Sequence, residues 1–243
     1  MIEGLDAPVE VRRHPKARRL TLRVSRTRRA IVVTVPDRCG MDVAGSFVQR
    51  HLDWVRACLD SLPAPVPFID GAIVPLRGVP HRIAFRPAQR GSGPVRVIAA
   101  TGGDVPVIEV SGPAEGAARR LVQFLTAEAK RDLDAAVMIH ARRLGLRATR
   151  ITVRDQTSRW GSCSSTGALS FSWRLILAPP HVLDYVAAHE VAHLAEMNHG
   201  PRFWALVAKT APDMNAAKDW LAVAGMDLHR YGDPPKGKRG GAH

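Results

Sequence analysis

The stretch HVLDYVAAHEVAHLAEMNHG, residues 181–200, decides the fold of this chain. Its apolar residues recur at helical spacing, and the two prolines directly in front of it suit the first turn of a helix. We therefore predict a helix over residues 181–197. The break-prone sequence at 198–200 should end it, and a further helix should run over residues 201–209.

Residues 189–193 within this helix have the pattern HEVAH. Side chains four residues apart lie one helical turn above each other, so His189 and His193 can face one metal ion while Glu190 reaches a water molecule beside it. A bound zinc ion lowers the pKa of such a water and polarises a substrate carbonyl. The pattern predicts that Glu190 is catalytic, taking a proton from water and passing it to the leaving amine.

A catalytic zinc site usually has three protein ligands and one open position, so a third ligand is needed. His199 follows His193 by six residues, just past the predicted helix end, where a turn can bring its ring back. Glu196 is the alternative, but ligands at three successive helical turns stack along a line and do not enclose an ion easily. We predict Zn²⁺ bound by His189, His193 and His199; the ligand chemistry does not exclude other divalent metals.

Upstream of this helix, residues 20–24 and 31–35 alternate apolar and polar side chains, which predicts a hairpin with a basic turn. A helix should follow over residues 42–61. Short apolar stretches separated by Gly, Pro and Ser predict further strands over residues 69–110. We therefore expect residues 1–112 to form a β-rich N-terminal accessory domain with one helix.

An amphipathic helix over residues 117–144 should open a second domain, residues 113–228. Strands are predicted at 151–154 and at 169–177, ahead of the HEVAH helix. The last segment, residues 229–243, lacks apolar periodicity and is predicted to be a disordered basic tail.

Composition favours a soluble cytoplasmic protein without a membrane partner. No apolar run approaches the length needed to cross a bilayer, and the first residues lack the apolar core of a signal peptide. Cys39, Cys58 and Cys163 have no CxxC spacing, which argues against a disulfide framework or a cysteine metal site.

The formal charge of +13 favours a polyanionic partner, because clustered cations neutralise phosphates and release counterions. Only six of the 35 basic residues are lysine, however, and a genome that favours arginine codons gives the same composition. Nucleic acid is therefore an alternative partner beside a peptide or protein substrate, and the oligomeric state stays open.

Several other polar residues have no assigned part in the reaction. Cys163 without a base partner is typical of a small buried side chain. Lone histidines are usually only hydrogen-bonded, which we expect for His51, His81, His140 and His181. Packing or surface charge is the expected role of Tyr185, Arg159, Arg174 and Arg202.

Three motifs around the helix, RWGSCSS at 159–165, WRLILAPP at 173–180 and NHGPRFW at 198–204, together resemble the YgjP-like metallopeptidase family. That family is related to SprT and Spartan proteases and to the small gluzincins. The resemblance is strong over residues 159–221 and looser at the N-terminal hairpin and helix. Metzincins share the three-histidine spacing, but they need glycine where this chain has Glu196.

The resemblance implies His189, His193 and His199 as metal ligands and Glu190 as the catalytic glutamate. It also implies an α+β fold: a zincin-like domain, with the HExxH helix against a small antiparallel sheet, preceded by the β-rich N-terminal domain. The strand at 169–177 would be an edge on which an extended peptide pairs. Small gluzincins often use a glutamate ligand, which keeps Glu196 as an alternative.

The expected function is a zinc-dependent metallopeptidase. One alternative is a metal-dependent hydrolase of nucleotides or other phosphoanhydrides, because metal-activated water also attacks phosphorus and the chain is basic. Another is a DNA-associated protease that holds nucleic acid with its basic N-terminal region.

Overall fold

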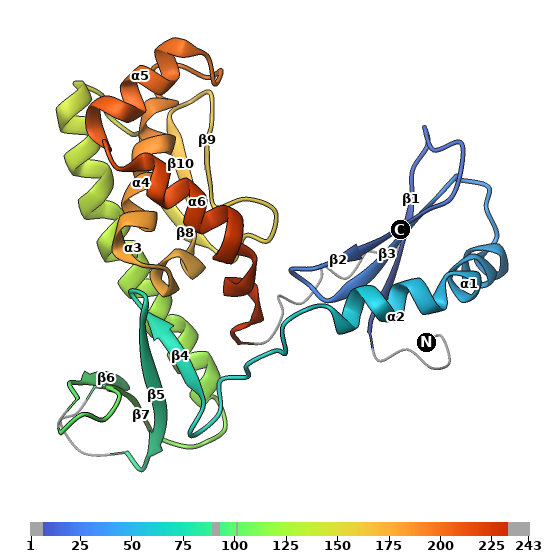
Figure 1. The fold of residues 1–243 in the computed structure, drawn as a ribbon, viewed down its shortest axis with the longest axis horizontal. Coiled ribbons are helices and arrows are strands. Elements are labelled where there is room, and N and C mark those ends of the chain that lie inside the picture. The colour runs from blue at the N-terminus through green and yellow to red at the C-terminus, as the bar shows by residue number, and fades with distance from the viewer. Residues whose placement is uncertain (1–6, 89–92, 101, 233–243) are drawn as a thin grey trace. The chain divides into compact units, whose positions relative to one another are not determined.

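The computed structural model describes residues 7–88, 93–100 and 102–232, which form a mixed α+β protein (Figure 1). The chain divides between Ala64 and Pro65 into two compact units, called here the N-terminal unit and the C-terminal unit.

This division differs from the predicted boundary at residue 112. The strands that we assigned to the N-terminal domain between residues 73 and 111 belong to the C-terminal unit. Ile108 of the last of these strands shares one hydrophobic core with Leu121 and Leu125 of the next helix. The link between them, residues 112–116, is rich in glycine and proline and forms a turn inside one unit. Its sequence resembles a domain linker, and only the packing of Ile108 against the helix shows that both sides belong to the same unit.

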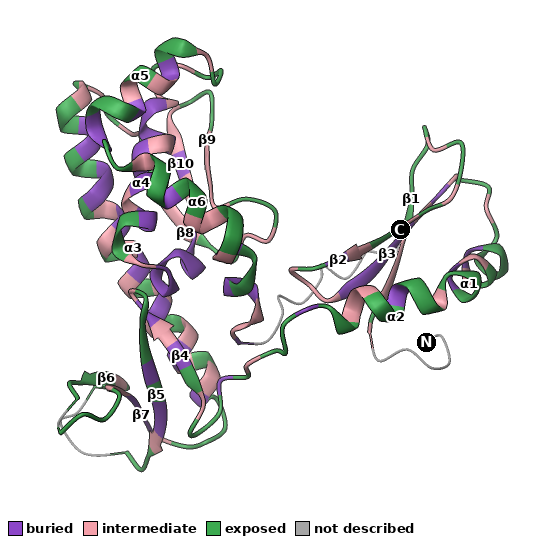
Figure 2. Ribbon diagram, viewed as in Figure 1, coloured by how far each residue is buried: buried purple, intermediate pink, exposed green. Residues whose placement is uncertain are grey.

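The N-terminal unit is a three-stranded sheet with two helices. Its elements are β1 (Val9–Arg13), β2 (Thr21–Ser25), β3 (Ala30–Val35), α1 (Met41–Arg50) and α2 (Leu52–Asp60). β3 is the central strand, parallel to β1 and antiparallel to β2, so β2 and β3 form the predicted hairpin. β3 is buried along most of its length (Figure 2). The predicted single helix is two helices, because His51 has non-helical backbone angles, φ −113° and ψ 17°.

The C-terminal unit begins with a four-stranded sheet, arranged in the order β4-β5-β7-β6. Its strands are β4 (Ile73–Leu76), β5 (Val79–Arg86), β6 (Val95–Ile98) and β7 (Val107–Ser111). The long helix α3 (Ala117–Leu144) follows and has the predicted bounds. Gly145 ends it in a left-handed conformation at φ 67°, which glycine adopts without steric cost.

A second, three-stranded sheet precedes the HEVAH helix. Its strands β8 (Arg150–Arg154), β9 (Gly161–Cys163) and β10 (Ala168–Ser172) lie in the order β8-β10-β9. β10 is parallel to β8 and antiparallel to β9, so the sheet is mixed and not antiparallel as expected. β10 is also the central strand, and β8 and β9 are the two edge strands.

The predicted strand over residues 169–177 is half strand and half 3-10 helix. β10 ends at Ser172, and the next five residues, Trp173–Leu177, form the helix η1. All five are buried, so there is no exposed face and no reason for period-two alternation to continue. The Ser172 side chain caps the turn by accepting a hydrogen bond from the Arg174 backbone N–H.

The HEVAH helix, α4 (Pro180–Ala192), ends five residues earlier than predicted. Its residues are buried on almost every side (Figure 2). It packs against α3, against β9, and against the later helices α5 (Pro201–Thr210) and α6 (Met214–Ala224). The helix α6 was not predicted from the sequence. No helix in the described parts of the chain is long and apolar enough to cross a membrane.

The C-terminal end of this unit is ordered further than predicted. A short 3-10 helix, η2 (Gly225–Arg230), contains His229, which is only 8% exposed although it was assigned to the tail. The buried Arg174 guanidinium holds this segment by donating to the backbone carbonyls of Leu228 and Tyr231, at 3.2 and 2.6 Å. The rest of the predicted tail, residues 233–243, lies outside the described residues.

Candidate active site

The last turn of α4 carries His189 and Glu190, and His193 is the residue that caps the helix. The rings of His189 and His193 lie 4.9 Å apart between centroids, so they stand one turn above each other on the same side of the helix. The early end of α4 matters here, because the chain is free to turn directly after His193.

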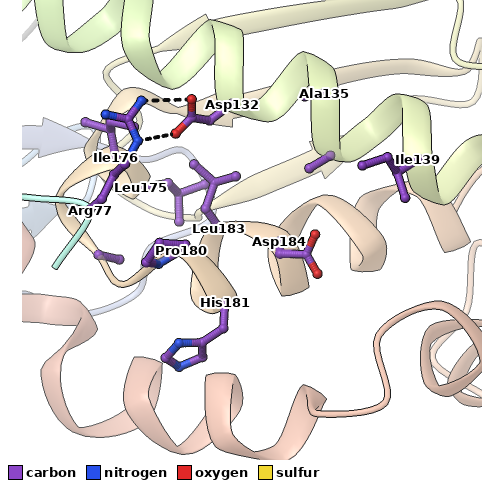
Figure 3. A pocket seen from close by; sticks show the side chains of 12 residues that line it. Arg77, Asp132, Ala135, Ile139, Leu175, Ile176, Pro180, His181, Leu183 and Asp184 are labelled. Carbon is purple, nitrogen blue, oxygen red and sulfur yellow. Dashed lines mark hydrogen bonds and ion pairs between the residues drawn. The ribbon is translucent and has the colours of Figure 1, made fainter.

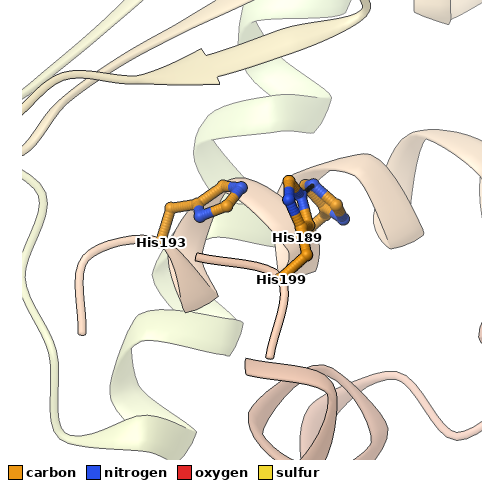
Figure 4. A group of neighbouring side chains, drawn as sticks. All are labelled: His189, His193 and His199. Carbon is orange, nitrogen blue, oxygen red and sulfur yellow. Dashed lines mark hydrogen bonds between the residues drawn. The ribbon is translucent and has the colours of Figure 1, made fainter. Parts of the chain in front are cut away.

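That turn brings His199 back to the helix (Figure 4). Its Nε2 lies 3.1 Å from Nε2 of His189, and one ring nitrogen from each of the three histidines lies within 4.8 Å of the others. Two zinc–nitrogen bonds of about 2.0–2.1 Å at a tetrahedral angle place the nitrogens about 3.4 Å apart. The three imidazoles are therefore a group that could hold one metal ion, with the His189–His199 pair close to that spacing.

Each ring of the helical pair has a partner that orients it. Nδ1 of His193 lies 3.0 Å from the backbone carbonyl oxygen of Glu196, a geometry in which the ring donates through Nδ1 and leaves Nε2 available to a metal. Nδ1 of His189 lies 3.5 Å from the Tyr185 hydroxyl. Glu196 is absent from the group of described side chains that could hold a metal, so its contact with the site is through its backbone.

Aromatic rings from α5 support the three histidines. Phe203 is fully buried, and its ring centroid lies 4.8, 4.5 and 4.7 Å from those of His189, His193 and His199. This contact was not predicted, although Phe203 lies in the NHGPRFW motif. Burial, and then the neighbouring histidines, lower the pKa of His189 to about 4, so its imidazole is neutral at pH 7 and able to bind a metal.

Glu190 is buried beside this cluster and is 5% exposed. Among the described residues, its Oε2 has no hydrogen-bond partner. Burial raises the pKa of Glu190 to about 7, while the charge of Arg159 acts in the opposite direction. A carboxyl group with a pKa near the working pH is suited to exchanging protons in both directions.

Gly161 of β9 makes room for the Glu190 side chain. A Cβ atom at Gly161 would lie 2.5 Å from Cγ and 2.6 Å from Oε1 of Glu190, closer than real side-chain contacts. Sequence reasoning did not single out this glycine, and the only signal was its place in the RWGSCSS motif. The edge strand and the glutamate therefore lie in direct van der Waals contact.

The contacts of the other polar residues considered from the sequence are those of packing and ordinary hydrogen bonding. Arg174 is 1% exposed and pairs with Asp155, so it packs the interior. Burial raises the pKa of the Cys163 thiol, which disfavours a nucleophilic thiolate. Of the lone histidines, the ring of His51 bonds a backbone carbonyl at 2.8 Å, that of His81 does so at 2.7 Å, and that of His140 bonds Thr210 and Asp184.

A separate pocket of about 450 Å³ lies at the other end of α4, between α3, η1 and the first turns of α4 (Figure 3). Arg77 at its rim donates two hydrogen bonds to Asp132, at 2.7 and 2.8 Å. The pocket contains His181 and Asp184 but none of the predicted site residues. Its arginine is already neutralised, so the pocket supplies no convergent chemistry comparable to the histidine cluster.

An α+β unit with three convergent imidazoles and a buried glutamate has the side-chain set of a metal-dependent hydrolase. The family model of the YgjP-like metallopeptidase domain matches residues 18–224. This chain therefore belongs to the YgjP-like family, whose metallopeptidase domain extends over most of both units.

The other comparisons add little. Among solved structures, the chain is similar to the metallopeptidase zymogen of Pyrococcus abyssi abylysin, with 17% identity and a TM-score of 0.33. That similarity covers 37% of this chain and 94% of the other. The curated proteins contain no match.

Proposed function

We propose that this protein is a zinc-dependent metallopeptidase in which His189, His193 and His199 bind the metal and Glu190 is the general base and acid. The proposal rests on one observation above all: three ring nitrogens within 4.8 Å of one another, beside a buried carboxyl group. When bound, zinc lowers the pKa of a water molecule and polarises the scissile carbonyl.

Glu190 then moves the proton. Its pKa of about 7 in the metal-free protein lets it accept a proton from the attacking water and return it to the departing amine nitrogen. Burial of Glu190 in a region of low dielectric constant strengthens its electrostatic interaction with the proton in both transfers, because few water dipoles screen the carboxylate charge. One side chain thus serves as base and then as acid.

The substrate is proposed to be an extended peptide that pairs with β9. This edge strand replaces the strand at 169–177 that the sequence favoured, because β10 already has partners on both sides. β9 packs against α4, and its Gly161 adjoins Glu190, so a peptide along this edge passes beside the catalytic carboxyl group. Main-chain pairing would supply affinity with little dependence on substrate side chains.

The test is Glu190→Gln, which keeps the shape of the side chain and removes its ability to take a proton. We expect hydrolysis of an unstructured protein such as casein to fall about 10²- to 10⁴-fold while bound zinc, measured by elemental analysis, stays near one per chain. Glu196→Gln on the following turn is the matched control and should keep activity. Unchanged hydrolysis in Glu190→Gln, or metal-dependent release of pyrophosphate from nucleotides in place of peptide cleavage, would contradict the proposal.

A further inference from the structure

A second hollow, in the N-terminal unit, has the features of a ligand site unrelated to the histidines. It has a volume of about 510 Å³ and lies between the edge strand β2 and the helix α2. We call it the β2–α2 groove; its lining residues are Leu22, Arg23, Val24, Arg26, Trp54, Cys58 and Ser61. Trp54 and Cys58 lie one turn apart on α2 and Ser61 is its C-cap residue, while Leu22 and Val24 supply half-buried apolar surface.

Within the described residues, the two arginines of the groove have no partner. Arg23 and Arg26 are exposed, and no hydrogen bond or ion pair with a described residue engages either guanidinium. The next two arginines of the turn between β2 and β3 differ in this respect, since Arg28 pairs with Glu10 at 2.5 Å and Arg29 donates to the Pro63 carbonyl at 2.9 Å. The groove therefore holds two positive charges that are free to meet an anion.

Trp54 gives the groove a flat apolar wall. It is 49% exposed, whereas the other four tryptophans of the chain are buried or intermediate. A half-exposed indole does little for the core, which in this unit is made by smaller side chains such as Val33, Val48 and Val55. An aromatic face beside unpaired guanidiniums is the combination that binds a nucleobase and its phosphate.

The charge of the chain is concentrated in the same unit. Residues 7–64 contain 12 Arg and Lys against five Asp and Glu, a net charge of +7 over 58 residues. Residues 65–233 contain 20 against 15, a net charge of +5 over 169 residues. An arginine bias acting equally along the chain would not give this contrast, so the charge points to a polyanion at the N-terminal unit.

We propose that the β2–α2 groove binds single-stranded nucleic acid, with a base stacked on Trp54 and adjacent phosphates held by Arg23 and Arg26. A single strand is favoured over a duplex because a base must leave its stack before an indole can reach its face. A nucleic acid is favoured over an acidic peptide because carboxylates match the arginines but leave the indole wall without a partner. This inference does not rest on the proposed peptidase activity.

Fluorescence anisotropy of the full-length protein with labelled oligothymidylate and oligouridylate of about 12 nucleotides tests the proposal, and the two probes separate DNA from RNA. Trp54→Ala should weaken binding about tenfold or more and remove quenching of intrinsic fluorescence. Arg23→Gln/Arg26→Gln should weaken binding and lower the slope of log K against log salt by about 1.4, since each phosphate contact on a single strand contributes about 0.7.

The matched control is Arg38→Gln/Arg50→Gln, which removes the same charge from exposed positions of this unit outside the groove. Circular dichroism verifies that each variant is folded. A smaller loss in the control than in the groove variant supports the proposal. Equal losses in the two double variants, unchanged affinity in Trp54→Ala, or stronger competition by a duplex or a polyglutamate peptide than by an unlabelled single strand would overturn it.

Discussion

Gly161 has no side chain at the one place in β9 where Glu190 needs the space. Gly161→Ala should push the carboxyl group aside by several tenths of an ångström or more, because the added Cβ would lie 2.5 Å from its Cγ. Small misplacements of a catalytic group are costly, so we expect a loss in kcat of about 100-fold. Zinc content should not change.

Gly200→Ala is the control for this prediction. Gly200 adjoins His199, but a Cβ there meets no atom within 4 Å, and its φ is −82°. We expect this variant to keep most of its activity. If the two glycine variants lose activity equally, the contact with Glu190 is not the cause.

Substituting His199 and Glu196 one at a time distinguishes between the two candidates for the third metal ligand. We expect His199→Ala to weaken zinc affinity by more than about 100-fold, because even the loss of groups that only orient ligands costs 10- to 100-fold. Glu196→Ala should retain the metal, since the group that contacts His193 is its backbone carbonyl. Competition with a fluorescent chelator measures both, and the reverse order of effects would make Glu196 the ligand.

The helix α5 supports the candidate site. Phe203 is fully buried and packs on all three imidazoles, so Phe203→Leu should loosen them and weaken zinc affinity about tenfold. The matched control is Phe171→Leu in β10, which is equally buried in the same core. Both should cost roughly 1 kcal/mol in the free energy of unfolding without metal. Equal zinc affinities in the two variants would assign Phe203 to the core alone.

The segment η2 should be sensitive to acid through His229. Burial, and then the charge of Arg174, lower its pKa to about 4, against about 6.5 in the unfolded chain. Between these values the unfolded chain holds more protons, so the free energy of unfolding decreases as pH falls from 6.5 to 4. His229→Phe, which keeps a ring against Trp160, should flatten this dependence in urea unfolding of the metal-free protein. An unchanged slope would count against a neutral buried imidazole.

Elements whose signals are local were predictable from the sequence. The bounds of α3 follow from its long apolar periodicity and from Gly145, and the hairpin follows from alternation in β2 and β3. The end of α4 was not predictable, because the apolar pattern continues past Ala192 although the chain turns there. Nor was η1, since a fully buried run of apolar residues carries no periodicity that separates a strand from a helix.

The residues of the candidate site also differ in how far local sequence spacing predicts them. His189, Glu190 and His193 are four residues or fewer apart, and helical geometry alone brings them together. Placing His199 required a guess about a turn, which the 3.1 Å approach of its ring to His189 supports. Gly161 contacts Glu190, which lies far along the chain, and Phe203 reaches His189 and His193 only because the chain turns back between α4 and α5, so neither contact follows from local spacing.

Each of the two units has a hydrophobic core of its own, and the proposed metal ligands all belong to the C-terminal unit. A ligand stabilises the structure that binds it by RT ln(1 + [L]/Kd), or about 2.7 kcal/mol at 100 times Kd. Removing zinc with a chelator should therefore speed hydrogen exchange in α4 and α5, where the ligand-bearing segments pack. Exchange in β3 and α1, which share the other core, should not change.

Mass spectrometry of exchanged peptides measures both units in one sample. His199→Ala is the control variant, in which the chelator should have no effect. Equal responses in the two units would mean that the metal governs the folding of the whole chain, and no response in α4 would remove the three histidines as its ligands.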